Sequence, residues 1–412
     1  MRPARGRPAS PPEATPPALL FGLRPRLWLM TVGHLVIDSN GALLFALLPL
    51  FVTQLHINLA QAGALSTLLL MTSSITQPLF GFVHDRYPLF PMAAAGLLVA
   101  GLGMGLTGFA TNYSQMVALV LISGFGIAAF HPQSVAQASR ASASSPEWGI
   151  AMFFTGASVG TGIMSLLIVP LASRFGPRAT LVTLIPAVIA AALFVRAYPT
   201  WMRPVPRQPG SATAADSVRA VALPLTMLLL VSILRSAVLT AYLTFLPTLV
   251  VFRTGSLGLG ALALAAFLFS GSVGALIGGA VAQRIGSAPV VVVSLIAGLL
   301  GLLPVPWLPT SILVPWMVGA GVLMFASEAQ VTALAQRLLP AFIGTASSLI
   351  MGVGLGLGNG GALITGAVAD RRGIQVAMTA TTLLMVGAIA AAFVYVLSMR
   401  GVRSTAARET SR

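Results

Sequence analysis

Long apolar stretches follow one another along nearly the whole chain, and they limit its fold more than any other feature. A helix needs about 20 such residues to cross the hydrocarbon core of a bilayer, where backbone groups must bond to one another. Only 8% of the residues are charged, against about 25% in soluble domains. We therefore expect an all-α membrane protein with twelve transmembrane helices. Their predicted ranges are 27–53, 59–83, 89–110, 113–136, 148–173, 178–198, 221–252, 257–282, 288–306, 310–336, 341–369 and 374–399.

The two halves of the chain resemble each other. A shift of 198 residues, without gaps, places Pro49 on Pro247 and Arg86 on Arg284. Two parallel six-helix repeats, related by an axis along the membrane normal, are typical of the major facilitator architecture. We therefore predict two pseudo-symmetric six-helix bundles with a substrate site between them. The expected order is a disordered cytoplasmic tail at 1–26, a bundle at 27–198, a cytoplasmic linker at 199–220, a bundle at 221–399 and a tail at 400–412.

The basic residues predict the orientation. All 23 of them are arginines, and with both termini on one side 17 lie on that side, five on the other and one inside a span. The positive-inside rule therefore places both termini in the cytoplasm. The net charge of +15 does not indicate nucleic acid, because the arginines collect at helix ends. The chain has no cysteine, which excludes disulfides and thiolate metal ligands.

The loop after the second span carries a compact motif of glycine, acid and base. Gly81 is followed four residues later by Asp85 and Arg86. This spacing resembles the loop signature of the major facilitator superfamily. The resemblance implies that the acid meets a helix N-terminus of the other half and latches one conformation. We assign Arg140, another cytoplasmic arginine, to the same candidate latch.

Five polar or charged residues lie inside the predicted spans: His34, Asp38, His131, Arg235 and Glu328. A charge at the bilayer centre costs about 2.5–3.5 kcal/mol on insertion scales, so such groups are functional by default. The spacing of four places His34 and Asp38 on one helix face. His131 precedes a helix-breaking proline, and it either lines the cavity or bonds carbonyls freed by that proline.

Arg235 has two alternative roles. Its planar fork of donors suits an anionic substrate, or it forms a permanent ion pair with Asp38 or Glu328. We assign Asn40 and Gln77, polar residues of the first and second spans, to the candidate substrate site together with Arg235 and His131. No metal cluster, nucleophile constellation or phosphate-binding loop is apparent, so we predict neither an enzyme nor a bound cofactor.

Several of these stretches resemble the fosmidomycin resistance protein family within the major facilitator superfamily. The resemblance covers most of the first half, with Gln133 standing where the family pattern has an acid. It implies an inner-membrane efflux protein of bacteria that exports a small drug-like or anionic compound. The residues that carry it are His34-x-x-x-Asp38, Gln61-x-Gly63, Gln77-Pro78-Leu79-x-Gly81, Asp85-x-x-Pro88, Phe130-His131-Pro132-x-Ser134 and, more weakly, Gly156, Ser158 and Gly160.

Together these features predict a monomeric secondary transporter whose partners are a small-molecule substrate, protons and the lipid bilayer, with no nucleic acid. Asp38 with His34 is the expected proton carrier, and Glu328 is the second candidate. Substrate arrival at Arg235 is expected to change the proton occupancy of Asp38. The alternatives are a proton symporter that imports a small organic anion and a non-transporting receptor on a transporter scaffold.

The arginine distribution gives a direct test of orientation. Reporter domains fused after Gly210 and after Arg412 should both report a cytoplasmic location, because the predicted linker and both tails lie on the arginine-rich side. Activity of paired cytoplasmic and periplasmic reporters in whole cells measures this. A periplasmic signal from either fusion contradicts the twelve-span topology.

Overall fold

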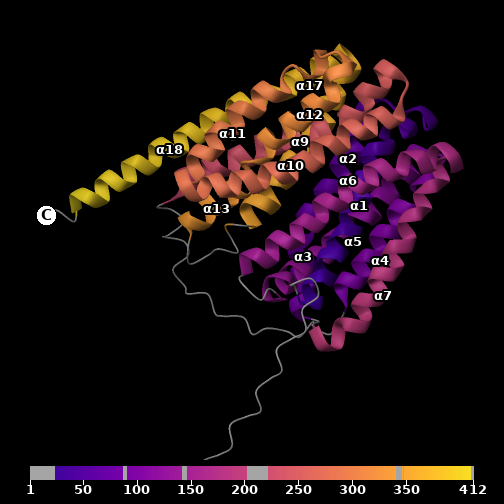
Figure 1. Ribbon diagram of the computed structural model, residues 1–412, viewed down its shortest axis with the longest axis horizontal. Coiled ribbons are helices and arrows are strands. Elements are labelled where there is room, and N and C mark those ends of the chain that lie inside the picture. The colour runs from indigo at the N-terminus through magenta and orange to yellow at the C-terminus, as the bar shows by residue number, and fades with distance from the viewer. Residues whose placement is uncertain are drawn as a thin grey trace, which may run out of the picture.

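A computed structural model describes residues 24–86, 91–141, 146–201, 221–339, 346 and 348–409. Within these residues, twelve helical segments are long and apolar enough to cross a membrane, as the sequence predicts. Figure 1 shows the two halves as separate bundles of helices, indigo to magenta for the first and rose to yellow for the second.

The helices of the first bundle are α1 (Pro25–Gln54), α2 (Leu59–Ile75), α3 (Gln77–Arg86), α4 (Met92–Gly105), η1 (Thr107–Phe109), α5 (Tyr113–Ala141), α6 (Pro146–Phe175), η2 (Pro177–Thr183) and α7 (Leu184–Trp201). Those of the second are α9 (Ala222–Thr254), α10 (Leu257–Ile285), α11 (Ser287–Leu302), η3 (Val305–Trp307), α12 (Thr310–Phe325), α13 (Glu328–Leu338), η5 (Ser348–Gly354), α15 (Leu355–Gly358), α16 (Gly361–Arg372), α17 (Ile374–Thr382) and α18 (Leu384–Glu409).

The second and tenth spans, each predicted as one helix, are interrupted. Between α2 and α3, the Thr76 hydroxyl donates to the Thr72 carbonyl at 2.6 Å, and Pro78, the second residue of α3, has no N–H to continue the helical ladder. Between α12 and α13, the break leaves Glu328 as the first residue of a new helix. A negative charge is favourable there because the helix dipole is positive at its N-terminus. The second break therefore fixes the position of one predicted site residue.

Helix α1 lies against α6 at very short range, and this contact positions the first site residues. A Cβ atom on Gly160 would lie 2.1 Å from the Leu35 carbonyl oxygen, so only glycine permits this approach. The Leu35 carbonyl belongs to the α1 turn that carries His34 and Asp38. Close helix approach through small residues is typical of membrane bundles. The glycines of α6 therefore determine where the His34 ring and the Asp38 carboxylate lie.

The two bundles meet along α2 and α16, and a carboxylate closes one end of this interface. Asp370, near the end of α16, accepts hydrogen bonds from the backbone N–H groups of Leu59 at 2.8 Å and Ala60 at 2.9 Å. These are the first two residues of α2, whose N–H groups have no partner within the helix. A Cβ atom on Gly366 would lie 2.2 Å from the Leu59 carbonyl oxygen. Asp370 thus caps a helix of the other bundle.

A second polar contact lies further along the same interface. Thr67 of α2 donates to the Asn359 carbonyl at 2.9 Å and accepts from the Leu363 N–H at 3.2 Å. The amide side chain of Asn359 in turn accepts from Thr240 of α9 at 2.9 Å. The bundles are therefore joined by hydrogen bonds as well as by close packing.

The side chains of Gly81, Asp85, Arg86 and Arg140 lie outside the residues that the structure describes, although their backbones belong to α3 and α5. The Asp370 contact was not predicted, yet the sequence contained a signal for it. Gly366, Asp370 and Arg371 have the same spacing as Gly81, Asp85 and Arg86.

The Asp370 cap leads to a testable prediction. Asp370→Asn should loosen this end of the interface, because an amide has one acceptor oxygen where the carboxylate uses two. An exposed anion at a helix N-terminus is worth about 0.3–1 kcal/mol, so the fraction of chains separated at this end should rise about two- to fivefold. Spin labels on Thr53→Cys and Val376→Cys, introduced into a chain without native cysteines, report the distance by pulsed electron resonance.

The matched control is Arg371→Gln, which removes a neighbouring exposed charge and leaves the cap in place. Its distance distribution should equal that of the parent chain. If Asp370→Asn also leaves the distribution unchanged, the carboxylate does not hold the bundles together.

Candidate functional site

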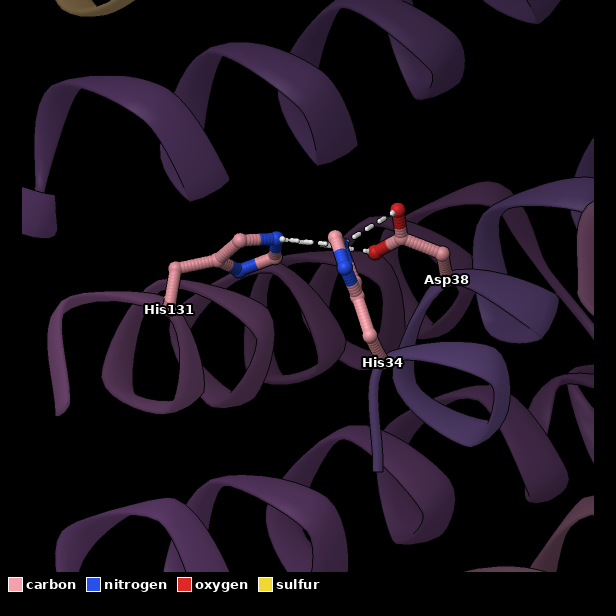
Figure 2. A group of neighbouring side chains, drawn as sticks. All are labelled: His34, Asp38 and His131. Atoms are coloured by element: carbon pink, nitrogen blue, oxygen red, sulfur yellow. Dashed lines mark hydrogen bonds and ion pairs between the residues drawn. The ribbon is translucent and has the colours of Figure 1, made fainter. Parts of the chain in front are cut away.

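Three of the predicted residues meet between α1 and α5. The His34 Nε2 atom lies 3.2 Å from Asp38 Oδ2 and 3.2 Å from the His131 Nε2 atom. The His131 Nε2 atom lies 3.7 Å from Asp38 Oδ1. Figure 2 shows the two rings directed toward each other with the carboxylate beside their meeting point. His131 is thus a partner of the α1 pair.

Backbone carbonyls fix the protonation pattern of both rings. The His34 Nδ1 atom lies 2.8 Å from the Phe153 carbonyl oxygen, and the His131 Nδ1 atom lies 2.8 Å from the Ile127 carbonyl oxygen. A carbonyl oxygen can only accept, so each Nδ1 carries the hydrogen. In the neutral form each Nε2 then presents a lone pair.

The consequence is a convergence of acceptors. Two Nε2 lone pairs and an ionised carboxylate are all acceptors, and no hydrogen lies between them in the neutral form of the rings. Such an arrangement repels itself unless a cation joins it. A proton on His34 Nε2 makes that nitrogen a donor to Asp38 Oδ2 or to His131 Nε2, each 3.2 Å away, and a proton on His131 Nε2 makes it a donor to His34. The geometry of His34, Asp38 and His131 therefore requires a bound proton or another positive charge.

Aromatic side chains surround one side of this cluster. The His34 ring stacks on Phe153, with ring centroids 3.8 Å apart and planes inclined by 28°. Phe154 lies against the same imidazole, with centroids 5.4 Å apart. The His34 side chain is fully buried, whereas Asp38 is 27% exposed and His131 is 15% exposed. A proton or solute must therefore reach the cluster through Asp38 and His131.

The same three residues have the composition of a metal site. Each offers one ligand atom, and these atoms lie within 4.8 Å of one another. The sequence predicted no metal ligands, because the residue that completes the set is 93 positions from Asp38 in the chain. Only the packing of α1 on α5 brings it into reach.

The second half contains its own charged pair, between α9 and α13. The Arg235 guanidinium is buried, and its Nη2 atom lies 3.6 Å from Glu328 Oε1. Its Nη1 atom donates to the Met324 carbonyl at 3.5 Å. Both distances are at the long limit for hydrogen bonds. Of the two ion-pair partners considered from the sequence, the structure therefore brings Glu328 to Arg235, in a loose contact.

The remaining predicted residues have different surroundings. Asn40 is buried, and its side-chain NH₂ donates to the carbonyls of Val36 and Ile37 at 3.1 and 2.9 Å. Its Oδ1 atom has no hydrogen-bond partner among the described residues. Gln77 is the first residue of α3 and is partly exposed. The structure does not join either residue to the His–Asp cluster by a described hydrogen bond.

Gln133 has a structural contact that explains how the chain tolerates an amide there. Its Oε1 atom accepts from the Ala93 N–H at 2.8 Å, in the first turn of α4. An amide oxygen satisfies this orphan N–H as a carboxylate would. The acid expected from the family pattern is therefore not needed for this cap.

Comparisons with known proteins agree with this architecture. The family model described as Major Facilitator Superfamily matches residues 30–358. The chain is 25% identical over 364 residues to the fosmidomycin resistance protein of Escherichia coli strain K12, covering 86% of this chain and 88% of that one. It is 26% identical over 371 residues to an uncharacterized MFS-type transporter, YfnC, of Bacillus subtilis strain 168, covering 88% and 90%.

Solved structures show the same fold at lower sequence identity. A bacterial homolog of the human lysosomal transporter Spinster, in an inward-facing and unoccupied conformation, superposes with a TM-score of 0.74 at 14% identity, covering 90% of this chain and 96% of that one. The nucleoside transporter NupG superposes with a TM-score of 0.69 at 15% identity, covering 90% and 98%.

Proposed function

The chain belongs to the Major Facilitator Superfamily, and on that premise we propose that it is a proton-coupled exporter of small drug-like or anionic compounds. It is a multi-pass membrane transporter and not an enzyme. We place it in the bacterial inner membrane with both termini cytoplasmic, as the arginine distribution predicts. It acts as a monomer, because each chain carries both halves of the alternating-access machinery.

One observation carries the coupling proposal. Three acceptors converge in a membrane-spanning bundle at separations of 3.2 to 3.7 Å, and they need one positive charge to be stable. A proton is the smallest cation that satisfies them. We assign the carrier role to Asp38 and His34, as the sequence predicts, and we add His131 as the third member. Glu328, which is 42% exposed beside Arg235, remains the second candidate carrier.

The Arg235–Glu328 contact supports an anionic substrate. A buried guanidinium has five donors in a fixed fork, and its two described partners lie at 3.5 and 3.6 Å. A carboxylate or phosphate group can bond that fork in a bidentate manner and at shorter range. We therefore place Arg235 in the substrate site, with His131, Asn40 and Gln77 as further candidate contacts.

Similarity to a protein named for fosmidomycin resistance supports export as the direction. The rival is import of a small organic anion with protons, which the same residues could drive. Overproduction of the chain in a drug-sensitive host separates the two. Raised resistance to antimetabolites supports export, whereas unchanged resistance with faster uptake of an organic anion supports import.

The carrier assignment predicts a specific loss in Asp38→Asn. A neutral amide cannot alternate between ionised and protonated forms, so accumulation driven by a proton gradient should fall to the level of protein-free liposomes. Exchange of substrate at equal concentrations should persist, because it requires no net proton movement. Asp38→Glu should retain part of the driven flux.

The measurement is flux of a transported compound into proteoliposomes under an imposed pH gradient. His56→Asn is the matched control, since His56 is exposed and lies outside the cluster. Full gradient-driven accumulation by Asp38→Asn removes the carrier role from this residue and transfers it to Glu328.

The substrate assignment predicts a different loss in Arg235→Lys. Lysine keeps the charge but lacks the fork, and a hydrogen bond to a charged group is worth about 1.5–3 kcal/mol, so apparent affinity should fall about ten- to a hundredfold. The maximal rate should change much less. Concentration dependence of proteoliposome flux measures both quantities. An unchanged half-saturation concentration means that Arg235 only forms an ion pair with Glu328.

A further inference from the structure

The His34–Asp38–His131 cluster has the dimensions of a tetrahedral metal site. A tetrahedral Zn²⁺ with nitrogen and oxygen ligands at about 2.0–2.1 Å has ligand atoms about 3.3 Å apart. The corresponding separations here are 3.2 Å between the two Nε2 atoms and 3.2 Å from His34 Nε2 to Asp38 Oδ2. The third, from His131 Nε2 to Asp38 Oδ1, is 3.7 Å. This last distance goes to the other carboxylate oxygen, so Asp38 either turns to offer one oxygen to both imidazoles or binds through both oxygens. One ligand atom of each residue already lies within 4.8 Å of the others.

The surroundings of the two imidazoles are also those of metal ligands. A ligating histidine almost always donates its other ring N–H to a carbonyl or carboxylate, which fixes the tautomer and the ring orientation. Both rings do so here, to the carbonyls of Phe153 and Ile127 at 2.8 Å. Each Nε2 atom therefore carries a free lone pair, and the two Nε2 atoms lie close to each other and to the carboxylate.

The partial exposure of two of the three residues indicates an open fourth coordination position on the metal. His34 is fully buried, but Asp38 and His131 are 27% and 15% exposed. Three protein ligands with access on one side leave room for water or a solute group, as in sites that exchange their fourth ligand. Two imidazoles with one carboxylate suit zinc and its first-row neighbours, whereas magnesium and calcium prefer oxygen ligands.

We propose that His34, His131 and Asp38 form a binding site for one divalent transition-metal ion of the Zn²⁺ class. The metal occupies the same lone pairs that otherwise share a proton. Its binding therefore displaces that proton and stops proton-driven flux. This last consequence rests on the coupling proposed above, whereas metal binding itself does not.

The binding test uses the full chain purified in detergent with an affinity tag that contains no histidine, after treatment with a chelator. Co²⁺ serves as the probe, because tetrahedral Co²⁺ with nitrogen and oxygen ligands absorbs strongly in the visible range. One Co²⁺ should bind per chain, and Zn²⁺ should displace it. Absence of the visible bands together with no Zn²⁺ retained after equilibrium dialysis overturns the proposal.

Variants locate the ion. His131→Gln should lose the Co²⁺ bands, whereas His56→Asn, which changes an exposed histidine elsewhere, should keep them. Should His131→Gln fail to fold, His131→Cys replaces one ligand by another. The chain has no native cysteine, so a sulfur-to-Co²⁺ charge-transfer band can come only from position 131. Unchanged Co²⁺ spectra in both position-131 variants place the metal elsewhere and refute the site.

Flux measurements keep the two proposals separate. Proton-driven flux is first measured with a chelator present and then with added Zn²⁺, which should abolish it in the parent chain. If the parent chain shows proton-driven flux but binds neither Co²⁺ nor Zn²⁺, the metal site is refuted and the coupling proposal is not. If the parent chain binds the metal and Asp38→Asn keeps its full proton-driven flux, the coupling role of Asp38 is refuted and the metal site is not.

Discussion

A charged side chain in a membrane-spanning bundle is stable only with an opposite charge within a few ångströms, supplied by another side chain or by a bound ion. Each half of this chain contains one such contact. In the first half the contact joins α1 to α5, through Asp38 and His131. In the second it joins α9 to α13, through Arg235 and Glu328. Under the 198-residue shift, Arg235 and Glu328 fall one position before Asp38 and His131. The polarity is reversed, because the acid lies on the first helix of one half and on the fourth span of the other.

The hydrogen bonds that join the two bundles come from residues outside the two charged clusters. Asp370 caps α2 at one end, and Thr67 accepts from the Leu363 N–H of α16 further along. If the arginines orient the chain as predicted, the start of α2 is at the outer face, and Asp370 holds the outer side closed. The predicted Asp85 motif lies at the opposite end of the α2–α3 span. The chain thus carries one glycine–acid–arginine motif at each end of this span, and the predicted Asp85 latch is the proposed counterpart of the Asp370 cap for the other closed state.

The sequence predicted what depends on local spacing and missed what depends on packing. Twelve spans follow from length and hydropathy, and the His34–Asp38 pair follows from a separation of four on one helix. The participation of His131 could not be derived, because it requires the packing of α1 on α5 and the tautomers set by two backbone carbonyls. Asp370 was missed although its motif repeats that of Gly81 and Asp85, because a charged turn at the end of a span is ordinary in a membrane protein. The division of the tenth span before Glu328 was missed too, since no proline marks it.

The position of α1 explains how occupancy of the cluster can move the whole protein. Without a cation, two lone pairs and a carboxylate at 3.2 to 3.7 Å repel, so the contact between α1 and α5 must relax. Helix α1 packs closely against α6 at Gly160, and it also contacts α9 and α10 of the other bundle. Helix α6 contacts α10 as well. Under the proposed coupling, these contacts are the route by which a change in the cation at Asp38 would reach the other bundle, and α9 itself carries Arg235. This route would connect the proposed proton site to the proposed substrate site without requiring the two to touch.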